Sequence, residues 1–418
     1  MGFASSYLRK HAYFDPFVPG VPVDGTGIIV VIPCYNEPDA ISAVNSLAGA
    51  FHPSFPVEVI MVVNAPENAP VEGLEQNKRT IAQLREWGRS NNHERFSLHT
   101  VEAPLFPSKH AGAGWARKTG MDEAVRRFNM AGNEKGIIVS FDADSLCGNN
   151  YFEAIEDCFR QDVSGCTIYF EHPLEKDGGE PGVIVDYELY LRYYVQAMRH
   201  AGFPWAFHTI GSCFAVTAAA YVKQGGMNRR KAGEDFYFLH KIFPLGNFTE
   251  LNTTTVLPSS RVSDRVPFGT GVAVKKLSGG ERRPLMTWPV KSFEETGELF
   301  RTLPRLFRAS GKEAAVIAST FHPMLREYLA DNRFVDKVSQ INLNSASYPA
   351  FRKRFFRWFG GLMMLRYLNY ARRTGRGDIS VTAASAGMLD RLGVPGANSN
   401  LELLNIYRRL QKETVWRC

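Results

Sequence analysis

The sequence predicts an α/β fold with a mainly parallel sheet flanked by helices, followed by an all-helical C-terminal domain. Apolar runs of strand length alternate with helix-length segments as far as Asp142, which is the pattern of parallel α/β layers. From about residue 291 onward only helical patterns are evident. A chain of 418 residues, 44% hydrophobic and 22% charged, is an ordinary globular chain of two or three domains.

The expected strands and helices follow in chain order. Strands are expected over 27–32, 57–63, 96–101, 136–141, 163–170 and 207–216. Helices are expected after Asp39 and over 72–90, 113–130, 183–200, within 350–373, and over 401–412. The continuous apolar run 27–32 fits a strand covered on both faces, as parallel sheets require.

The chain is expected to have four parts. These are a lead segment (1–26), two halves of the α/β domain (27–150 and 151–284) and the helical domain (285–418). The boundary near 284 follows a stretch rich in Gly, Ser, Lys and Arg.

Charge and cysteine usage limit the class of protein. A net charge of +7 suits an anionic substrate, an anionic membrane surface or nucleic acid, and by itself selects none of them. The six cysteines contain no CxxC pair, which indicates neither a zinc site nor a disulfide framework. No signal peptide and no apolar stretch of ~20 residues is evident, so we expect a cytoplasmic protein.

Two carboxylates follow the apolar run 136–141, as Asp142-Ala143-Asp144. A hard divalent cation needs oxygen ligands held close together in this way. An aspartate that merely ends a strand is the alternative. Ligands of parallel sheets lie beyond the carboxyl ends of the strands, so Tyr35, Asn64 and the two aspartates are expected around one crevice.

A second acidic pair, Glu234-Asp235, precedes residues with helical periodicity and is expected to open a helix. Negative charge at a helix N-terminus is stabilising, so simple capping is the alternative to a catalytic role. The preceding Gly225-Gly226 is expected to form a turn.

Taken together, Val31 to Glu37, Ser140 to Ser145, and Gly225-Gly226 followed by Gly233-Glu234-Asp235 resemble the family 2 glycosyltransferases of GT-A fold. The resemblance covers roughly residues 27–265. It implies an inverting transfer of a sugar from a nucleoside-diphosphate sugar to a hydroxyl acceptor, of the kind used in cell-envelope polysaccharide biosynthesis. The implied partners are a UDP- or GDP-sugar and a glycan or lipid-linked acceptor, without nucleic acid.

The resemblance also implies roles for individual residues. Asp144 and Asp142 are the expected ligands of Mg²⁺ or Mn²⁺, and Asp235 is the expected base, with Glu234 as its partner. The expected donor-binding residues are Pro33, Tyr35, Glu37, Asn64, Lys109, Arg117, Asp142, Ala143, Arg261 and Arg265. The expected acceptor-binding residues are Gly211, Ser212 and Gly226.

The sequence departs from the family at three positions. Asn64 stands where an acidic pair is common, Lys118 stands where Asn is usual, and region 259–265 lacks the His that completes the metal shell in many relatives. The identity of the donor's nucleobase and the third metal ligand therefore stay open. Asp264 is one candidate for that ligand. Loop 263–283 has the glycines and cations of a lid, or is a plain surface connection.

Residues 350–373 carry seven Lys or Arg, no acid and many aromatic side chains. Peripheral contact with an anionic membrane and a helix packed into the domain core are the two interpretations. There are two rival functions. One is a metal-dependent phosphatase that uses an aspartate of Asp142-Ala143-Asp144, the DxD motif, and the other is a noncatalytic nucleotide-sugar-binding protein.

Overall fold

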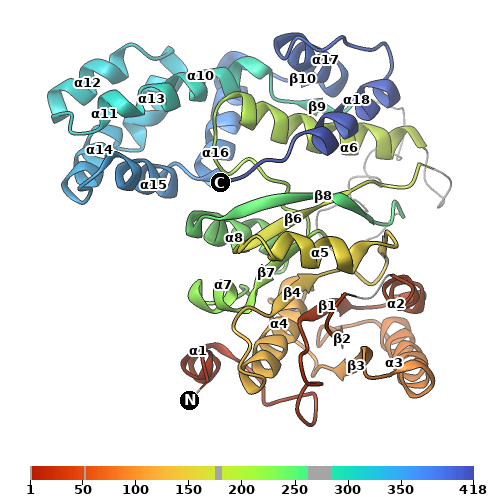
Figure 1. Cartoon of the computed structure of the whole chain (residues 1–418). Coiled ribbons are helices and arrows are strands. Elements are labelled where there is room, and N and C mark those ends of the chain that lie inside the picture. Colours follow the sequence, from red (N-terminus) through yellow and green to blue (C-terminus); the bar gives the residue numbers. More distant parts are fainter. Residues whose placement is uncertain (1, 51–52, 175–180, 262–283) are drawn as a thin grey trace. The chain divides into compact units, whose positions relative to one another are not determined.

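The computed structural model describes residues 2–50, 53–174, 181–261 and 284–418. The chain forms two compact units (Figure 1). Unit 1 comprises Met1–Ile184, Thr209–Ser278 and Gln411–Cys418, and unit 2 comprises Val185–His208 and Gly279–Leu410.

Unit 1 is built on an eight-stranded sheet with the order β3-β2-β1-β4-β7-β6-β8-β5. Its strands are β1 (Ile28–Cys34), β2 (Val57–Val63), β3 (Phe96–Glu102), β4 (Ile137–Ser140), β5 (Leu146–Cys147), β6 (Gly165–Phe170), β7 (Phe214–Thr217) and β8 (Phe248–Leu257). The pairs β1–β2, β2–β3, β1–β4 and β6–β8 are parallel, whereas β7 runs antiparallel to β4 and β6, and β5 to β8. The predicted fold class, a mainly parallel sheet flanked by helices with C-terminal helices, is confirmed and is consistent with the GT-A type.

Helices cover this sheet. They are α1 (Ser5–His11), α2 (Ala40–Ala48), α3 (Val71–Asn91), α4 (Ala113–Met130), α5 (Tyr151–Phe159), α7 (Ala218–Lys223) and α8 (Glu234–Ile242), while α6 (Pro181–His200) continues into unit 2. Helix α4 packs against β1 and β2 and also contacts α1, α7 and α8. A Cβ at Gly120 would lie 2.4 Å from Cγ1 of Val31, so glycine at this position lets α4 approach the sheet closely.

The prediction of a strand over 207–216 is wrong for most of this range, because only Phe214–Thr217 forms a strand. The preceding residues close turns instead, with the Cys213 N–H donating to the Ile210 carbonyl at 3.0 Å. An apolar run shows burial, and a buried loop gives the same signal as a buried strand.

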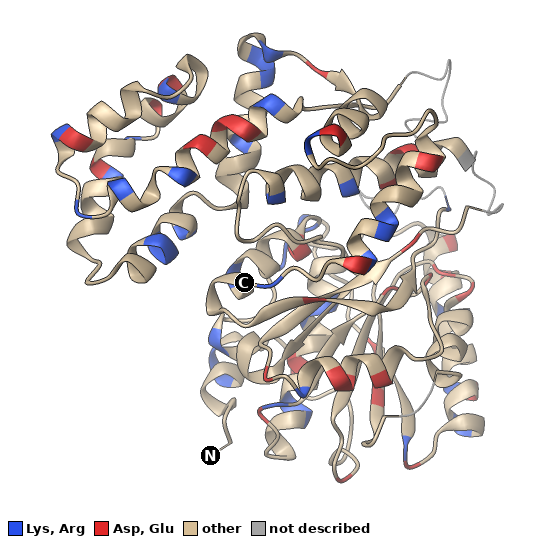
Figure 2. Ribbon diagram, turned by 45° about the horizontal axis from the view of Figure 1, so that its top comes forward, with Lys and Arg blue, Asp and Glu red and all other residues tan. Residues whose placement is uncertain are grey.

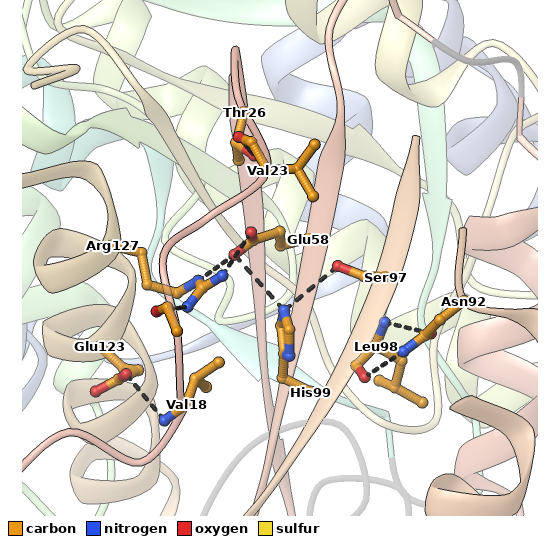
Figure 3. A network of polar contacts seen from close by, with 11 residues as sticks. Val18, Val23, Thr26, Glu58, Asn92, Ser97, Leu98, His99, Glu123 and Arg127 are labelled. Atoms are coloured by element: carbon orange, nitrogen blue, oxygen red, sulfur yellow. Dashed lines mark hydrogen bonds and ion pairs between the residues drawn. The ribbon is translucent and has the colours of Figure 1, made fainter. Parts of the chain in front are cut away.

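A buried ion pair in unit 1 joins α4 to the start of β2 (Figure 3). The guanidinium of Arg127 donates from both Nε and Nη2 to the carboxylate of Glu58, and both side chains are almost fully buried. His99 on β3 lies 3.8 Å from the same carboxylate, and burial lowers the pKa of this imidazole. Such a two-pronged arginine contact fixes both position and orientation, so it anchors α4 on the sheet.

Unit 2 contains the predicted C-terminal helices. These are α10 (Val290–Arg301), α11 (Leu303–Leu306), α12 (Gly311–Ser319), α13 (Pro323–Asp331), α14 (Phe334–Leu343), α15 (Tyr348–Trp358), α16 (Gly361–Ala371), α17 (Val381–Arg391) and α18 (Asn400–Glu413). A short antiparallel pair, β9 (Met286–Thr287) with β10 (Ile379–Ser380), interrupts the all-helical pattern. Within the described ranges, no helix is long and apolar enough to cross a membrane.

The basic and aromatic segment 350–373 forms two helices, α15 and α16, rather than the single helix expected. Phe351, Phe355 and Phe356 on α15 are buried, which places its aromatic face in the core of unit 2. Its Lys and Arg side chains are exposed, and Figure 2 marks the Lys and Arg positions of the ribbon in blue. These three aromatic residues are therefore core residues, whereas the basic face of α15 is exposed.

Candidate functional site

The sheet brings the predicted motifs together at one edge. Strands β2, β1 and β4 are parallel neighbours, so the segments that follow Val63, Cys34 and Ser140 leave the sheet on the same side. These segments carry the expected nucleotide-binding loop and the two aspartates of the DxD motif. The strand order therefore brings these segments to one edge of the sheet, as expected for a ligand site in a parallel sheet.

Two of these segments are tied together by Asn77 on α3. Its side-chain amide donates to the Asn64 carbonyl at 2.8 Å, and its side-chain oxygen accepts from the Asn36 N–H at 2.9 Å. The Asn64 N–H in turn donates to the Cys34 carbonyl at 3.0 Å. Asn36 has a positive φ of 49°, a conformation that asparagine tolerates better than most residues. The loop after β1 is thus held in a defined shape.

Glu37 and Asp144 meet at Arg261. The Arg261 guanidinium donates to the Glu37 carboxylate and lies 3.5 Å from Oδ2 of Asp144. Glu37 is fully buried and also accepts from the Asp39 N–H at 3.1 Å. Burial opposes the charge of Arg261, but the two carboxylates outweigh this effect and raise the pKa of its guanidinium. Residues 37, 144 and 261 therefore form one ionic cluster.

Arg117 on α4 contacts two further acids of the candidate site, Asp142 and Glu234. Its Nη2 donates to Asp142 and its Nη1 to Glu234, while its Nε donates to the Ser140 hydroxyl at 3.1 Å. Only 4% of the Arg117 side chain is exposed. Arg117 is one of the expected donor-binding residues, and the structure places its guanidinium between carboxylates of two distant motifs. One guanidinium thereby links the DxD motif to the acidic pair.

Two glycines make room for this arrangement. A Cβ at Gly211 would lie 2.4 Å from Nη2 of Arg117, and one at Gly114 would lie 2.2 Å from the Arg230 carbonyl oxygen. The Gly211 carbonyl accepts a 2.6 Å hydrogen bond from the Ser140 hydroxyl. Gly211 and its buried neighbour Ser212 were expected at the acceptor pocket, and the structure places Gly211 directly against Arg117.

The helix expected at the acidic pair is confirmed, because α8 begins at Glu234 after Gly233 in the left-handed conformation. Burial raises the pKa of Glu234, and Arg117 partly offsets this. Burial and the neighbouring Glu234 raise the pKa of Asp235 to about 7. Arg117 is paired with Asp142 and Glu234, and its charge lowers the pKa of Asp235, but burial and the Glu234 carboxylate outweigh this effect.

The remaining predicted residues lie in different environments. Tyr35 and Pro33 are half-buried, Ala143 is buried between the two aspartates, and Lys109 is exposed. Gly226 is buried, with a positive φ of 69° that suits the expected turn. Arg265, Asp264 and the loop 263–283 lie outside the described residues.

The two aspartates of the DxD motif fit a divalent cation that takes other ligands from elsewhere. The side chains of Asp142 and Asp144 are 34% and 31% exposed, which leaves carboxylate oxygens within reach of solvent. The described part of the chain contains no group of three or more His, Cys, Asp or Glu that could hold a metal. Mg²⁺ typically binds through one or two carboxylates together with substrate phosphates and water, and this donor set suits that mode.

Sequence reasoning missed Ser140 and Asn77. Ser140 was placed in an apolar strand and in the motif Ser140 to Ser145 without a role of its own, and Asn77 lies on a helix with a polar composition. Their roles come from tertiary hydrogen bonds, which leave no periodic pattern in the sequence.

No protein-family profile matches the chain, and no curated protein matches it in sequence. Among solved structures, S. aureus TarS 1-349 in complex with UDP-GlcNAc is 12% identical, with a TM-score of 0.42 over 80% of this chain and 92% of that chain. The mannosyltransferase PcManGT from Pyrobaculum calidifontis, in complex with GDP-Man and Mn²⁺, is 13% identical, with a TM-score of 0.34 over 98% of this chain and 92% of that chain. Similarity at this level carries no argument about the function of the chain.

Proposed function

We propose that the protein is a glycosyltransferase that moves a sugar from a nucleoside-diphosphate sugar to a hydroxyl acceptor, with inversion. The observation that carries the proposal is the Arg117 bridge. It connects Asp142 of the DxD motif to Glu234 of the acidic pair, although 92 residues of sequence separate these two acids. An enzyme that transfers a group between two substrates must hold both of them close together, and this bridge brings the donor-side and acceptor-side acids into one site.

The donor side of the proposed site consists of the loop after β1, Asn64, and the DxD motif. Asn64 offers both a donor and an acceptor, which suits the edge of a uracil or guanine base. Mg²⁺ or Mn²⁺ bound at Asp142 and Asp144 would stabilise the charge of the leaving nucleoside diphosphate. Arg261 is paired with Glu37 and lies 3.5 Å from Asp144, which places a cation beside the proposed diphosphate site.

The acceptor side consists of the acidic pair and the Gly211–Ser212 turn. Asp235 is the proposed base, which takes the proton of the acceptor hydroxyl as that oxygen attacks the anomeric carbon. A pKa of about 7 lets this carboxylate accept a proton near neutral pH more readily than an ordinary aspartate does. A base on one side and a leaving diphosphate on the other favour in-line displacement, and hence inversion.

Residues 27–150 are the proposed donor half and residues 151–284 the proposed acceptor half. A glycan or a lipid-linked saccharide is the proposed acceptor class. The exposed basic face of α15 supports peripheral contact with an anionic surface, which would bring the protein to a lipid-linked acceptor.

The test is release of nucleoside diphosphate from UDP- and GDP-sugars with Mn²⁺, measured for wild type, Asp235→Asn and Asp157→Asn. Asp157 pairs with Arg160 on the surface and serves as the matched control. We expect Asp235→Asn to lose at least 100-fold in kcat, the scale of a lost general base, and the control to keep full activity. Full activity of Asp235→Asn refutes the base assignment.

Inorganic phosphate, transferred sugar and melting temperature, measured on the same samples, separate the rival functions. A phosphatase would release inorganic phosphate and transfer no sugar. A noncatalytic binding protein would show a ligand-induced rise in melting temperature without turnover.

A further inference from the structure

The N-terminal segment, residues 2–18, is fastened along α4. The Ala4 N–H donates to Oδ1 of Asn129 at 2.8 Å, and the Val18 N–H donates to the Glu123 carboxylate at 3.1 Å. Between these points, Arg126 donates to the Phe14 carbonyl at 2.9 Å. The segment is therefore a specifically attached part of unit 1.

Tyr7 lies at the centre of this attachment, in a buried polar cluster. Its hydroxyl donates to Oδ1 of Asp122 at 2.7 Å, and the Tyr221 hydroxyl donates to the same oxygen at 2.8 Å. Lys118 donates to the other oxygen of Asp122 at 2.8 Å and lies 3.3 Å from the Tyr7 hydroxyl. Burial and the Asp122 carboxylate raise the pKa of Tyr7, which keeps its phenol protonated as a donor. The cluster fixes the position of the Tyr7 ring.

The Tyr7 hydroxyl also touches the turn before the acidic pair. A Cβ at Gly226 would lie only 2.0 Å from the Tyr7 oxygen, so the backbone of Gly226 packs directly on the phenol. On its other side the turn is held by Lys241 of α8, which donates to the carbonyls of Gly226 at 2.7 Å and Gln224 at 3.1 Å. The start of loop 225–233 is thus clamped between Tyr7 and α8.

The rest of this loop contacts the same segment and the catalytic helix. The guanidinium of Arg229 lies 4.0 Å from the ring centre of Tyr13 and 5.2 Å from that of Trp115, which is cation–π geometry. The Asn228 side chain donates to the Glu234 carbonyl at 3.1 Å. Displacement of the loop would therefore be transmitted to the first turn of α8.

We propose that Tyr7 is a positioning residue for the acidic pair: by fixing Gly226, it sets where Glu234 and Asp235 meet the acceptor. This inference rests on the proposed transferase function. Positioning errors near 1 Å cost catalysis much more than they cost substrate binding at a separate subsite. Loss of the Tyr7 contact is therefore expected to lower kcat and to leave the donor KM unchanged.

Tyr7→Phe is the first test, because it removes the hydroxyl and keeps the ring. We expect kcat for sugar transfer to fall about tenfold, with a donor KM within about a factor of two of wild type. Tyr328→Phe is the matched control, since it removes another buried hydroxyl bond, to the Met363 carbonyl at 3.1 Å in unit 2. The control is expected to lower the melting temperature without changing kcat at 25 °C.

A double-mutant cycle tests the contact itself. Gly226→Ala introduces a methyl group into the space of the Tyr7 hydroxyl, so its loss of kcat is expected to be at least threefold smaller in the Tyr7→Phe background. Arg229→Ala removes the contacts of the loop with Tyr13 and Trp115 and leaves the buried cluster around Tyr7 intact, so it is a second test of the loop's position. Unchanged kcat in both Tyr7→Phe and Arg229→Ala, or additive effects in the cycle, overturns the positioning role while the transferase function stands. No transfer by wild type from any UDP- or GDP-sugar overturns both.

Discussion

Replacement of Arg117 by methionine tests whether its guanidinium controls both stability and the acidity of the site. Methionine keeps an unbranched side chain of similar length but leaves Asp142 and Glu234 without their cation. Removing one partner of a buried ion pair typically costs about 3–5 kcal/mol. Asp142 is a third exposed and can recover water, whereas the Glu234 side chain is only 4% exposed. We therefore expect the lower end of that range, about 3 kcal/mol, at pH 7.

The cost should depend on pH. Arg117 lowers the pKa values of Glu234 and Asp235, so its removal raises these values further above those of the unfolded chain. When the pKa of a carboxyl is higher in the folded than in the unfolded state, the protein loses stability as the pH rises from the unfolded to the folded pKa. The difference in the free energy of unfolding between Arg117→Met and wild type is thus expected to be smaller at pH 5 than at pH 8. Urea unfolding at both pH values measures it.

The matched control is Arg127→Met, because Arg127 is equally buried and its partner Glu58 lies in the core rather than at the site. Both variants should lose similar stability, but only Arg117→Met should move the rising limb of the kcat/KM pH profile above about 7. A stability loss under 1 kcal/mol for Arg117→Met, or an identical shift of the limb in the control, would refute the reasoning.

Further predictions concern individual acids and the basic helix. Asp235→Asn should increase stability at pH 8 by about 2 kcal/mol, half the full value of a pKa shift from 3.8 to about 7, because Asp235 is only half-buried. An equal gain at pH 4 contradicts this. Asp144→Asn should lose most of the Mn²⁺-dependent rise in melting temperature caused by a nucleotide sugar, and a full rise would exclude Asp144 as a ligand. Asp142→Asn should move the rising limb of the pH profile to lower pH, since Asp142 raises the pKa of Asp235; no movement argues against their coupling. The double variant Arg354→Gln/Arg357→Gln should weaken flotation with anionic vesicles, and absence of wild-type flotation removes the membrane hypothesis.

The sequence predicted those features that have a local signal. The apolar run 27–32 identified a central strand, and the acids of Glu234-Asp235 identified the start of a helix, because each pattern reflects local backbone structure and burial. Over 207–216 the same logic failed, since a buried loop beside Arg117 is as apolar as a strand.

The ionic partners within the site left no such signal. A single Arg117 in a helix looks like a surface cation, and only the fold shows that it is buried between Asp142 and Glu234. Likewise, Glu37 was expected to bind donor, and its burial against Arg261 depends on residues more than 200 positions away. Residue type indicated which groups have the required chemistry, whereas their pairing is a property of the tertiary structure.

The pairing also explains why the two acidic motifs should not behave as independent sites. Arg117 is the cation shared by Asp142 and the acidic pair, so a change of charge on one side changes the proton affinity of the other. Loss of Arg117 raises the pKa of Asp235, and loss of the Asp142 charge lowers it. These shifts have opposite signs, although both substitutions break the same ion pair. A purely structural role for the bridge predicts that both variants lose activity without moving the pH profile, so the direction of each shift distinguishes electrostatic control from simple mispositioning.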